Sequence, residues 1–340
     1  MHSENIILLK FFHFIPALFV YFIVFVIIYI YTQYCVLDLS GPFSFQIFLI
    51  IIIYLFSAMT IINHLLSMIT SPGKVERNWD RNIDMEKHPE YKGKKKEFYC
   101  KTCAMKRPER SHHCKVCKMC VLKMDHHCPW IANCVGFYNQ KYFYLFLIYA
   151  TIGTLLISIS LGTKIYFYYD STNKLNTITD SNRTITNFSS SFNMSSNVSN
   201  QHIQHNLTNL VTMFFGFKTP FINICVCSIS AILFIAIGIL LIHQTNLISN
   251  NLTSIESCIY KKKEENPFYT DNKILCLSIV LGYNKLRWFL PIFESNVYNN
   301  GYSFKKPCDQ ENINKNLDGT KDNFQKLQAE LEVSDRQLAV

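Results

Sequence analysis

Long apolar stretches alternate with polar segments along this 340-residue chain. Four stretches offer roughly 20 or more mostly uncharged residues, the length that a helix needs to cross a bilayer. They cover about Phe11–Tyr31, Phe45–Ile69, Tyr142–Tyr168 and Phe221–Ile242. Residues 47–53 are apolar on every side of a helix, as in a membrane span. The pattern predicts an α-helical integral membrane protein with four transmembrane helices. The first stretch is too long and has the wrong flanks for a cleaved signal peptide, so we interpret it as a permanent anchor.

Polar segments separate these helices and give the predicted domain order. Turn residues at 41–42 and 71–73 mark the two ends of the second helix. Residues 170–209 have low complexity, since 23 of the 40 are Asn, Ser or Thr. We identify no internal repeat. The predicted order is a cytosolic N-terminus (1–10), a first helix (11–31), a second helix (45–69), a cytosolic loop (70–141), a third helix (142–168), a lumenal low-complexity loop (169–219), a fourth helix (221–242) and a cytosolic tail (243–340).

The distribution of positive charge predicts the orientation in the membrane. Of 33 Lys and Arg residues, 16 fall between Ser71 and Lys141 and 12 fall after Asn250. Only three fall between Asp170 and Thr219. Lys and Arg accumulate on the cytoplasmic side of membrane proteins, so both termini and the loop after the second helix are predicted to be cytosolic. No nucleic-acid partner is expected, because the basic residues follow the topology and no reader motif accompanies them.

A cysteine- and histidine-rich segment lies in this cytosolic loop. Residues 100–134 hold seven cysteines and four histidines, including the paired clips Cys100-x2-Cys103 and Cys114-x2-Cys117. Cytosolic thiols stay reduced, so dense cysteine there indicates metal binding or catalysis rather than disulfides. The intervening residues are too polar to build a core without a metal. The segment therefore predicts zinc binding that supplies folding energy.

Counting the ligands leaves a remainder. Two closed Cys3His sites use six cysteines and two histidines, which leaves one cysteine and two histidines. Spacing alone does not decide which ligands share an ion. Zinc with four protein ligands has no open position, so both ions are predicted to be structural. A leftover thiol in a cationic loop is a candidate nucleophile.

These residues resemble a known family. The sequences Asp125-His126-His127-Cys128-Pro129-Trp130 and Asn133-Cys134-Val135-Gly136 are similar to the DHHC cysteine-rich domain of membrane protein S-acyltransferases, the palmitoyltransferases. The resemblance places this domain at residues 98–148, between the second and third helices. Thr253-Ser254-Ile255-Glu256 and Asn266-Pro267-Phe268-Tyr269, after the fourth helix, are also similar to that family.

The resemblance also implies roles for single residues. Cys128 would be the nucleophile that becomes S-acylated, His126 its general base, and Asp125 the group that orients His126. Trp130 would lie against the acyl chain or act as an interfacial anchor. The implied ligands of two structural zinc ions are Cys100, Cys103, His113 and Cys120 for one, and Cys114, Cys117, His127 and Cys134 for the other. His112 receives no role.

The chain departs from the family pattern at two places. Ser71-Pro72-Gly73 stands where the family has Asp-Pro-Gly, and Thr253-Ser254 where it has two threonines. Serine keeps the hydroxyl of threonine, so hydrogen bonding to the active site is expected to persist.

The implied reaction is the transfer of a long-chain acyl group from palmitoyl-CoA to a cysteine of a substrate protein at the cytosolic membrane face. The expected location is the endomembrane system, which includes the Golgi, the endoplasmic reticulum and the plasma membrane. A non-catalytic zinc-stabilised membrane scaffold is the main alternative. A RING-like ubiquitin ligase is disfavoured because a terminal Cys-x2-Cys pair is missing. A transporter is disfavoured because the four helices carry no charged residue mid-span.

Overall fold

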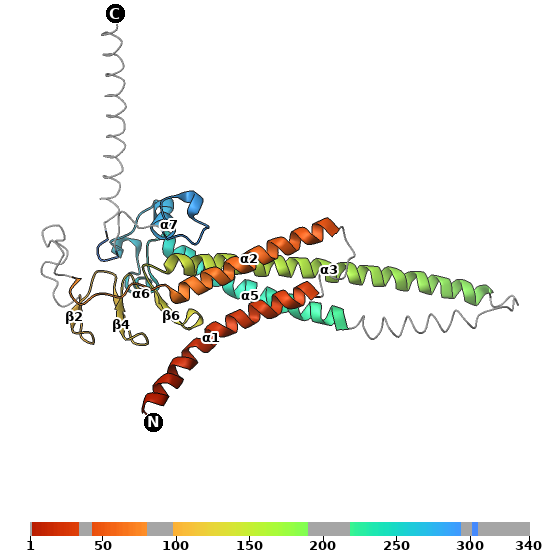
Figure 1. The fold of residues 1–340 in the computed structure, drawn as a ribbon. Helices are drawn as coiled ribbons and strands as arrows, with labels where there is room; N and C mark the ends of the chain where they lie inside the picture. Colours follow the sequence, from red (N-terminus) through yellow and green to blue (C-terminus); the bar gives the residue numbers. More distant parts are fainter. Residues whose placement is uncertain (1, 34–42, 80–97, 190–217, 294–300, 305–340) are drawn as a thin grey trace, which may run out of the picture. The chain divides into compact units, whose positions relative to one another are not determined.

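The computed structural model describes residues 2–33, 43–79, 98–189, 218–293 and 301–304. Four long helices dominate it (Figure 1), and each contains a stretch long and apolar enough to cross a membrane. The cysteine-rich segment lies between the second and third of them. The predicted fold class is therefore confirmed. The four helices are α1 (His2–Tyr31), α2 (Phe43–Ile69), α3 (Gln140–Ser189) and α5 (Lys218–Ser249).

The chain divides into two compact units. The first contains Met1–His64 and Tyr144–Ile242, which form most of the four long helices. Its buried core contains Ile27, Ile53, Ile157, Leu161 and Val226. Tyr31 is buried beside them, and its hydroxyl shares a 2.8 Å hydrogen bond with the Ser160 hydroxyl, so α1 and α3 are joined by a polar contact as well as by apolar packing.

Helix α3 extends beyond the predicted third span. Residues 169–189, which the sequence assigned to a lumenal loop, continue the helix to Ser189. Threonine hydroxyls donate back to carbonyls four residues earlier, as from Thr172 to Tyr168 and from Thr177 to Asn173. Asp170 and Lys174 form an ion pair at the same spacing. Local bonds thus satisfy the polar side chains of Thr172 and Thr177 within the helix. The rest of the predicted loop, residues 190–217, lies outside the described residues.

The second unit contains Leu65–Phe143 and His243–Val340. Between α2 and α3 its described residues form three small antiparallel hairpins, in the region labelled β2, β4 and β6 in Figure 1. They pair β1 (Tyr99–Cys100) with β2 (Met105–Lys106), β3 (His112–Cys114) with β4 (Met119–Val121), and β5 (His126–Cys128) with β6 (Asn133–Val135).

The three hairpins repeat one another every 14 residues. In their registers Cys100 faces Met105, Cys114 faces Met119 and Cys128 faces Asn133. Each turn ends on a residue with positive φ, and these residues are Ala104, Lys118 and Ala132. The expectation of a chain without internal repeats is therefore wrong for this segment. The signal in the sequence is the 14-residue spacing of the cysteines and histidines, which is masked by the divergent residues between them.

A turn at residues 71–75 packs against the hairpins. The amide of Val75 donates to Cys120 O at 3.0 Å, and the amide of Leu122 donates to Gly73 O at 2.8 Å. Gly73 has a φ of 102°, and its amide donates to the Ser71 hydroxyl at 3.3 Å. A Cβ on Gly136 would lie 2.4 Å from Pro72 O, so only glycine permits this approach. Ser71 thus forms a local side-chain turn at the position where it departs from the family pattern.

After α5 the chain folds back within the second unit. It forms α6 (Ser254–Ile259), a 3₁₀ turn η5 (Lys263–Glu265), α7 (Lys273–Leu281) and a 3₁₀ turn η6 (Lys285–Arg287). Thr253 caps α6: its hydroxyl accepts the Glu256 amide at 3.2 Å, and the Glu256 carboxylate accepts the Thr253 amide at 2.9 Å. Such a reciprocal capping box satisfies two backbone donors at the start of the helix.

Candidate metal centres and active site

Two groups of four potential metal ligands form within the hairpins. One contains Cys100, Cys103, His113 and Cys120, and the other contains Cys114, Cys117, His127 and Cys134. In each group the ligand atoms all lie within 4.8 Å of one another. Both groups could hold a metal ion. They bring together the side chains that the resemblance grouped.

The groups interleave along the repeat. A hairpin turn supplies a Cys-x2-Cys clip, and the following hairpin supplies the histidine and the third cysteine. In each clip the amide of the second cysteine donates to the sulfur of the first. Cys103 N lies 3.4 Å from Cys100 Sγ, and Cys117 N lies 3.3 Å from Cys114 Sγ. These amide contacts stabilise thiolate charge.

The distances between donors fit a tetrahedrally bound ion. With metal–sulfur bonds of 2.3 Å and metal–nitrogen bonds of 2.0–2.1 Å, tetrahedral donors would lie about 3.5–3.8 Å apart. In the second group Nδ1 of His127 lies 3.7, 3.4 and 3.5 Å from the sulfurs of Cys114, Cys117 and Cys134. In the first group Nδ1 of His113 lies 3.2 Å from Cys103 Sγ and 3.9 Å from Cys120 Sγ. The donor sets therefore fit a cation that takes sulfur and nitrogen ligands.

The electrostatics of the sulfurs also favour a cation. Burial raises the pKa of Cys120, and the neighbouring sulfurs of Cys100 and Cys103 raise it further. Burial and the sulfurs of Cys114 and Cys117 act in the same direction on Cys134. Several thiolates at such short separation repel one another unless a positive charge lies between them. Both groups thus have the charge requirement of a metal site.

The third hairpin supplies His127 and Cys134 to the second group, but its own Cys128 does not begin a Cys-x2-Cys clip. Ile131 stands 14 residues after Cys117, where the first two hairpins have the second cysteine of the clip. Lys141 stands 14 residues after His127, and Ile148 stands 14 residues after Cys134. All three partners that a clip at Cys128 would need are therefore replaced. The repeat accounts for the thiol that ligand counting left over.

Cys128 lies instead beside an Asp–His pair. Nδ1 of His126 is 2.6 Å from Oδ2 of Asp125, which is fully buried. Cys128, two residues further along β5, lies close enough to the His126 ring to raise its pKa. The His126 ring packs edge-on against Phe143, with ring centroids 5.4 Å apart. Because β5 alternates its side chains, His126 and Cys128 project on one side and His127, a member of the second ligand group, on the other.

The surroundings favour a charged Asp–His pair. Burial lowers the pKa of His126, but hydrogen bonds and charges from Asp125 and Cys128 outweigh burial and raise the pKa to about 9. Burial alone would raise the pKa of Asp125, yet His126 and Ser254 hold it below its usual range. A buried carboxylate thus orients an imidazole next to a thiol. The imidazole can accept the thiol proton and return it.

A residue far along the chain completes the Asp125 environment. The Ser254 amide donates to Asp125 Oδ1 at 2.7 Å, and the Ser254 hydroxyl donates to Oδ2 at 2.9 Å. Gln244, in the last turns of α5, donates to the same Oδ2 at 3.2 Å. The carboxylate therefore has hydrogen-bond partners at both oxygens. The family motif pointed to Ser254; no sequence signal pointed to Gln244.

Arg110 joins the hairpins to the segment after α5. Its guanidinium forms two 2.7 Å hydrogen bonds with the Glu256 carboxylate, and it donates to Asn251 Oδ1 and O at 3.1 and 2.9 Å. The guanidinium carbon also lies 4.3 Å from the centroid of the Phe268 ring. Both charged side chains are at most 4% exposed. Sequence reasoning missed Arg110, because its partner lies 146 residues away.

The remaining predicted site residues lie around this centre. Trp130 follows Cys128 in the 3₁₀ turn η4 (Pro129–Ile131), and its side chain is 51% exposed. His112 lies outside both ligand groups, with Nδ1 3.3 Å from Nη1 of Arg107. Burial and the Arg107 charge lower the pKa of His112.

Spanning helices that enter and leave a compact unit with two metal-ligand groups define a multi-pass membrane protein with a cysteine-rich domain. Residues 93–261 match the family model described as DHHC palmitoyltransferase, and the chain belongs to this family.

Three relatives show the extent of the similarity. The chain is 36% identical to palmitoyltransferase PFA3 of Candida glabrata over 70 residues. These residues make up 21% of this chain and 21% of that protein. This chain is 34% identical over 170 residues to palmitoyltransferase ZDHHC20 of Bos taurus, covering 42% and 47%. It is 27% identical over 310 residues to human ZDHHC20, covering 83% and 74%. The chain thus spans about a fifth to a half of the length of the first two relatives.

Proposed function

We propose that this protein is a protein S-acyltransferase that moves a long-chain acyl group from acyl-CoA to a cysteine of a substrate protein. The proposal rests on one observation above all: the buried Asp125 carboxylate holds the partly exposed His126 ring beside Cys128, a thiol outside both ligand groups. Family membership and relatives named palmitoyltransferases support the same activity.

In the first half-reaction the Cys128 thiolate attacks the thioester carbonyl carbon of acyl-CoA. A carbon–sulfur bond forms to Cys128, the bond to the CoA sulfur breaks, and CoA leaves as a thiolate. His126, which took the Cys128 proton, returns a proton to the leaving sulfur. The product is an S-acyl enzyme, as in other covalent mechanisms with a cysteine nucleophile.

In the second half-reaction the substrate thiol attacks the acyl-enzyme carbonyl. His126 accepts the proton of the substrate thiol, and a carbon–sulfur bond forms to the substrate. The bond from the acyl carbon to Cys128 breaks, and Cys128 leaves as a thiolate beside the protonated His126. Asp125 keeps the imidazole in one tautomer and stabilises its charged form throughout. One thioester replaces another, so positioning of the three reactants carries most of the catalytic task.

We assign zinc to the two ligand groups, because Cys3His sets at these distances are typical of structural zinc. The ions would hold the turns of the hairpins together and supply folding free energy. His127 would be a ligand and would thereby fix the strand that carries His126 and Cys128. We further propose that the cysteine-rich unit and both termini face the cytosol of an endomembrane, where thiols stay reduced and substrate cysteines are accessible.

Acyl-enzyme formation tests the proposal. The full-length protein in detergent is incubated with labelled palmitoyl-CoA, and label that neutral hydroxylamine releases is measured. Wild type is expected to become labelled, and Cys128→Ser is expected to lose that label. Cys225→Ser is the matched control, since it changes a cysteine in α5 and should keep the label. Hydroxylamine-sensitive label retained in Cys128→Ser would exclude the nucleophile assignment. Unlabelled wild type with its metal bound would instead support a non-catalytic scaffold.

A further inference from the structure

The segment from Lys273 to Phe293 is tied at two points to the ends of candidate spanning helices. At its start, Nζ of Lys273 donates to Ser249 O at 3.0 Å and to Asn250 Oδ1 at 3.1 Å. Ser249 is the last residue of the apolar stretch in α5. The start of this segment is therefore held where that helix ends.

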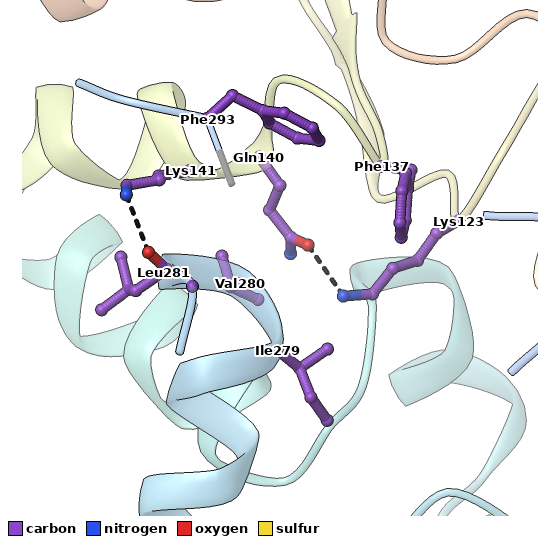
Figure 2. Close-up of a pocket in the computed structure, with 9 residues that line it drawn as sticks. Lys123, Phe137, Gln140, Lys141, Ile279, Val280, Leu281 and Phe293 are labelled. Atoms are coloured by element: carbon purple, nitrogen blue, oxygen red, sulfur yellow. Dashed lines mark hydrogen bonds between the residues drawn. The ribbon is translucent and has the colours of Figure 1, made fainter. Parts of the chain in front are cut away.

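The second tie is a buried lysine at the start of α3. Nζ of Lys141 donates to the carbonyls of Leu281, Arg287 and Ile292 at 2.7, 3.0 and 2.8 Å, and Figure 2 shows the bond to Leu281. An ammonium group has three donors, so these carbonyls match its full capacity. Lys141 is 4% exposed and lies one residue inside the apolar stretch that begins at Gln140. The chain after α7 is thus folded around the first turn of a second spanning helix.

The surface of this segment is apolar and basic. Leu286 is 88% exposed and Phe289 is 58% exposed, and the large apolar side chains of Leu290 and Ile292 also exceed 40%. Residues 272–293 contain no Asp or Glu but contain three basic residues, Lys273, Lys285 and Arg287. So many exposed large apolar side chains in one short segment mark an interaction surface.

We propose that residues 283–293 form an interfacial segment that lies in the headgroup region of the bilayer and binds anionic phospholipid. Both ties join it to one end of the apolar stretch of a candidate spanning helix, which would bring it to the headgroup region of the bilayer. Apolar side chains would enter the acyl boundary, while Lys285 and Arg287 would pair with lipid phosphates. The indole nitrogen of Trp288 already donates to Gly282 O at 2.7 Å, so the ring can be immersed without an unsatisfied donor. The inference does not depend on the proposed acyl transfer.

Photocrosslinking tests the contact. The photoreactive residue p-benzoylphenylalanine replaces Leu286 in the full-length protein, which is placed in nanodiscs of phosphatidylcholine and phosphatidylserine with labelled acyl chains. Tyr99 is the control position, because it is 45% exposed on the β1–β2 hairpin and already aromatic. Lipid labelling at position 286 should exceed labelling at position 99 several-fold. Equal labelling, or a crosslink from 286 to a second protein chain in place of lipid, would overturn the proposal.

The anionic preference has its own measurement. With the probe at 286, the ratio of phosphatidylserine to phosphatidylcholine adducts should exceed the ratio in the disc. The double substitution Lys285→Gln and Arg287→Gln should bring the adduct ratio down to the disc ratio, while total lipid labelling persists. Both side chains are exposed, so the variant is expected to fold. A preference that survives the double substitution, or that is missing in wild type, would refute the role of these two residues.

Discussion

The Asp125 carboxylate is held by Ser254, which lies 129 residues later in the chain and bonds to both carboxylate oxygens. The same carboxylate accepts a hydrogen bond from Nδ1 of His126 at 2.6 Å. The amide and hydroxyl of Ser254 thus fix the plane of the group that orients His126. Ser254 is a positioning residue, because it acts on the proposed reaction through Asp125.

Removing the Ser254 hydroxyl should slow acylation of Cys128. A hydrogen bond to a charged group contributes about 1.5–3 kcal/mol, so Ser254→Ala should lower the first-turnover rate roughly tenfold or more. Ser254→Thr keeps the hydroxyl and should retain most of the rate. Rapid-quench measurement of labelled acyl-enzyme gives these rates.

Ser257→Ala is the matched control, because that hydroxyl donates only to the Ser254 carbonyl. It should leave the acylation rate near that of wild type. If Ser254→Ala acylates as fast as Ser257→Ala, the positioning role is wrong.

The buried Arg110–Glu256 pair should contribute to stability rather than to chemistry. Removing one partner of a buried pair leaves an uncompensated charge and costs about 3–5 kcal/mol. Arg110→Ala should therefore unfold at clearly lower temperature or denaturant concentration. Lys174→Ala breaks the exposed Asp170–Lys174 pair and should cost at most about 0.5 kcal/mol. Equal effects of the two substitutions would contradict the assigned role of Arg110.

Metal content should separate the ligand cysteines from Cys128. Elemental analysis of purified wild type should find about two zinc ions per chain, the capacity of two four-ligand sites. Cys134→Ala should lose metal and stability, because its sulfur belongs to the second group. Cys128→Ser should keep the metal content of wild type. A lower zinc content in Cys128→Ser would show that the division into ligands and nucleophile is incorrect.

Lys123 should make stability depend on pH. Burial, then the Arg110 charge, lower the pKa of this lysine to about 7, against the opposing charges of Glu256 and Asp125. Above pH 7 the unfolded chain holds the proton and the folded chain does not, so stability should rise as pH rises from 7 towards 10. The contribution is at most about 1.4 kcal/mol per pH unit.

Lys123→Met should remove that slope. In wild type, Nζ of Lys123 donates to Gln140 Oε1 at 3.0 Å (Figure 2). Combining Lys123→Met with Gln140→Leu therefore avoids an unpaired amide oxygen. The difference in unfolding free energy between wild type and the double variant should change with pH between 7 and 9. A constant difference over that range would mean that Lys123 keeps its proton in the folded protein.

The sequence was most informative where a signal is local. Apolar length alone predicted four candidate spans, because a bilayer demands a continuous run of apolar residues. The Cys-x2-Cys clips predicted metal binding, because one turn brings both sulfurs together. Local pattern was misleading after residue 168, where Asn, Ser and Thr indicated a loop and the helix continues to Ser189. Thr172 and Thr177 each donate to a carbonyl four residues back, so their hydroxyls are satisfied without breaking the helix.

The sequence by itself determined the class of the protein: four apolar spans, two metal clips and one thiol in excess of the ligand count. Only the tertiary structure decided what surrounds that thiol. Ser254 and Gln244 reach Asp125 across more than 100 residues, and Glu256 reaches Arg110 across 146. Such contacts leave no periodic pattern in the sequence. They form only when the end of α5 and the segment after it pack against the hairpins. Burial then gives these polar groups their effect, since a buried charge needs its partners and cannot obtain them from water.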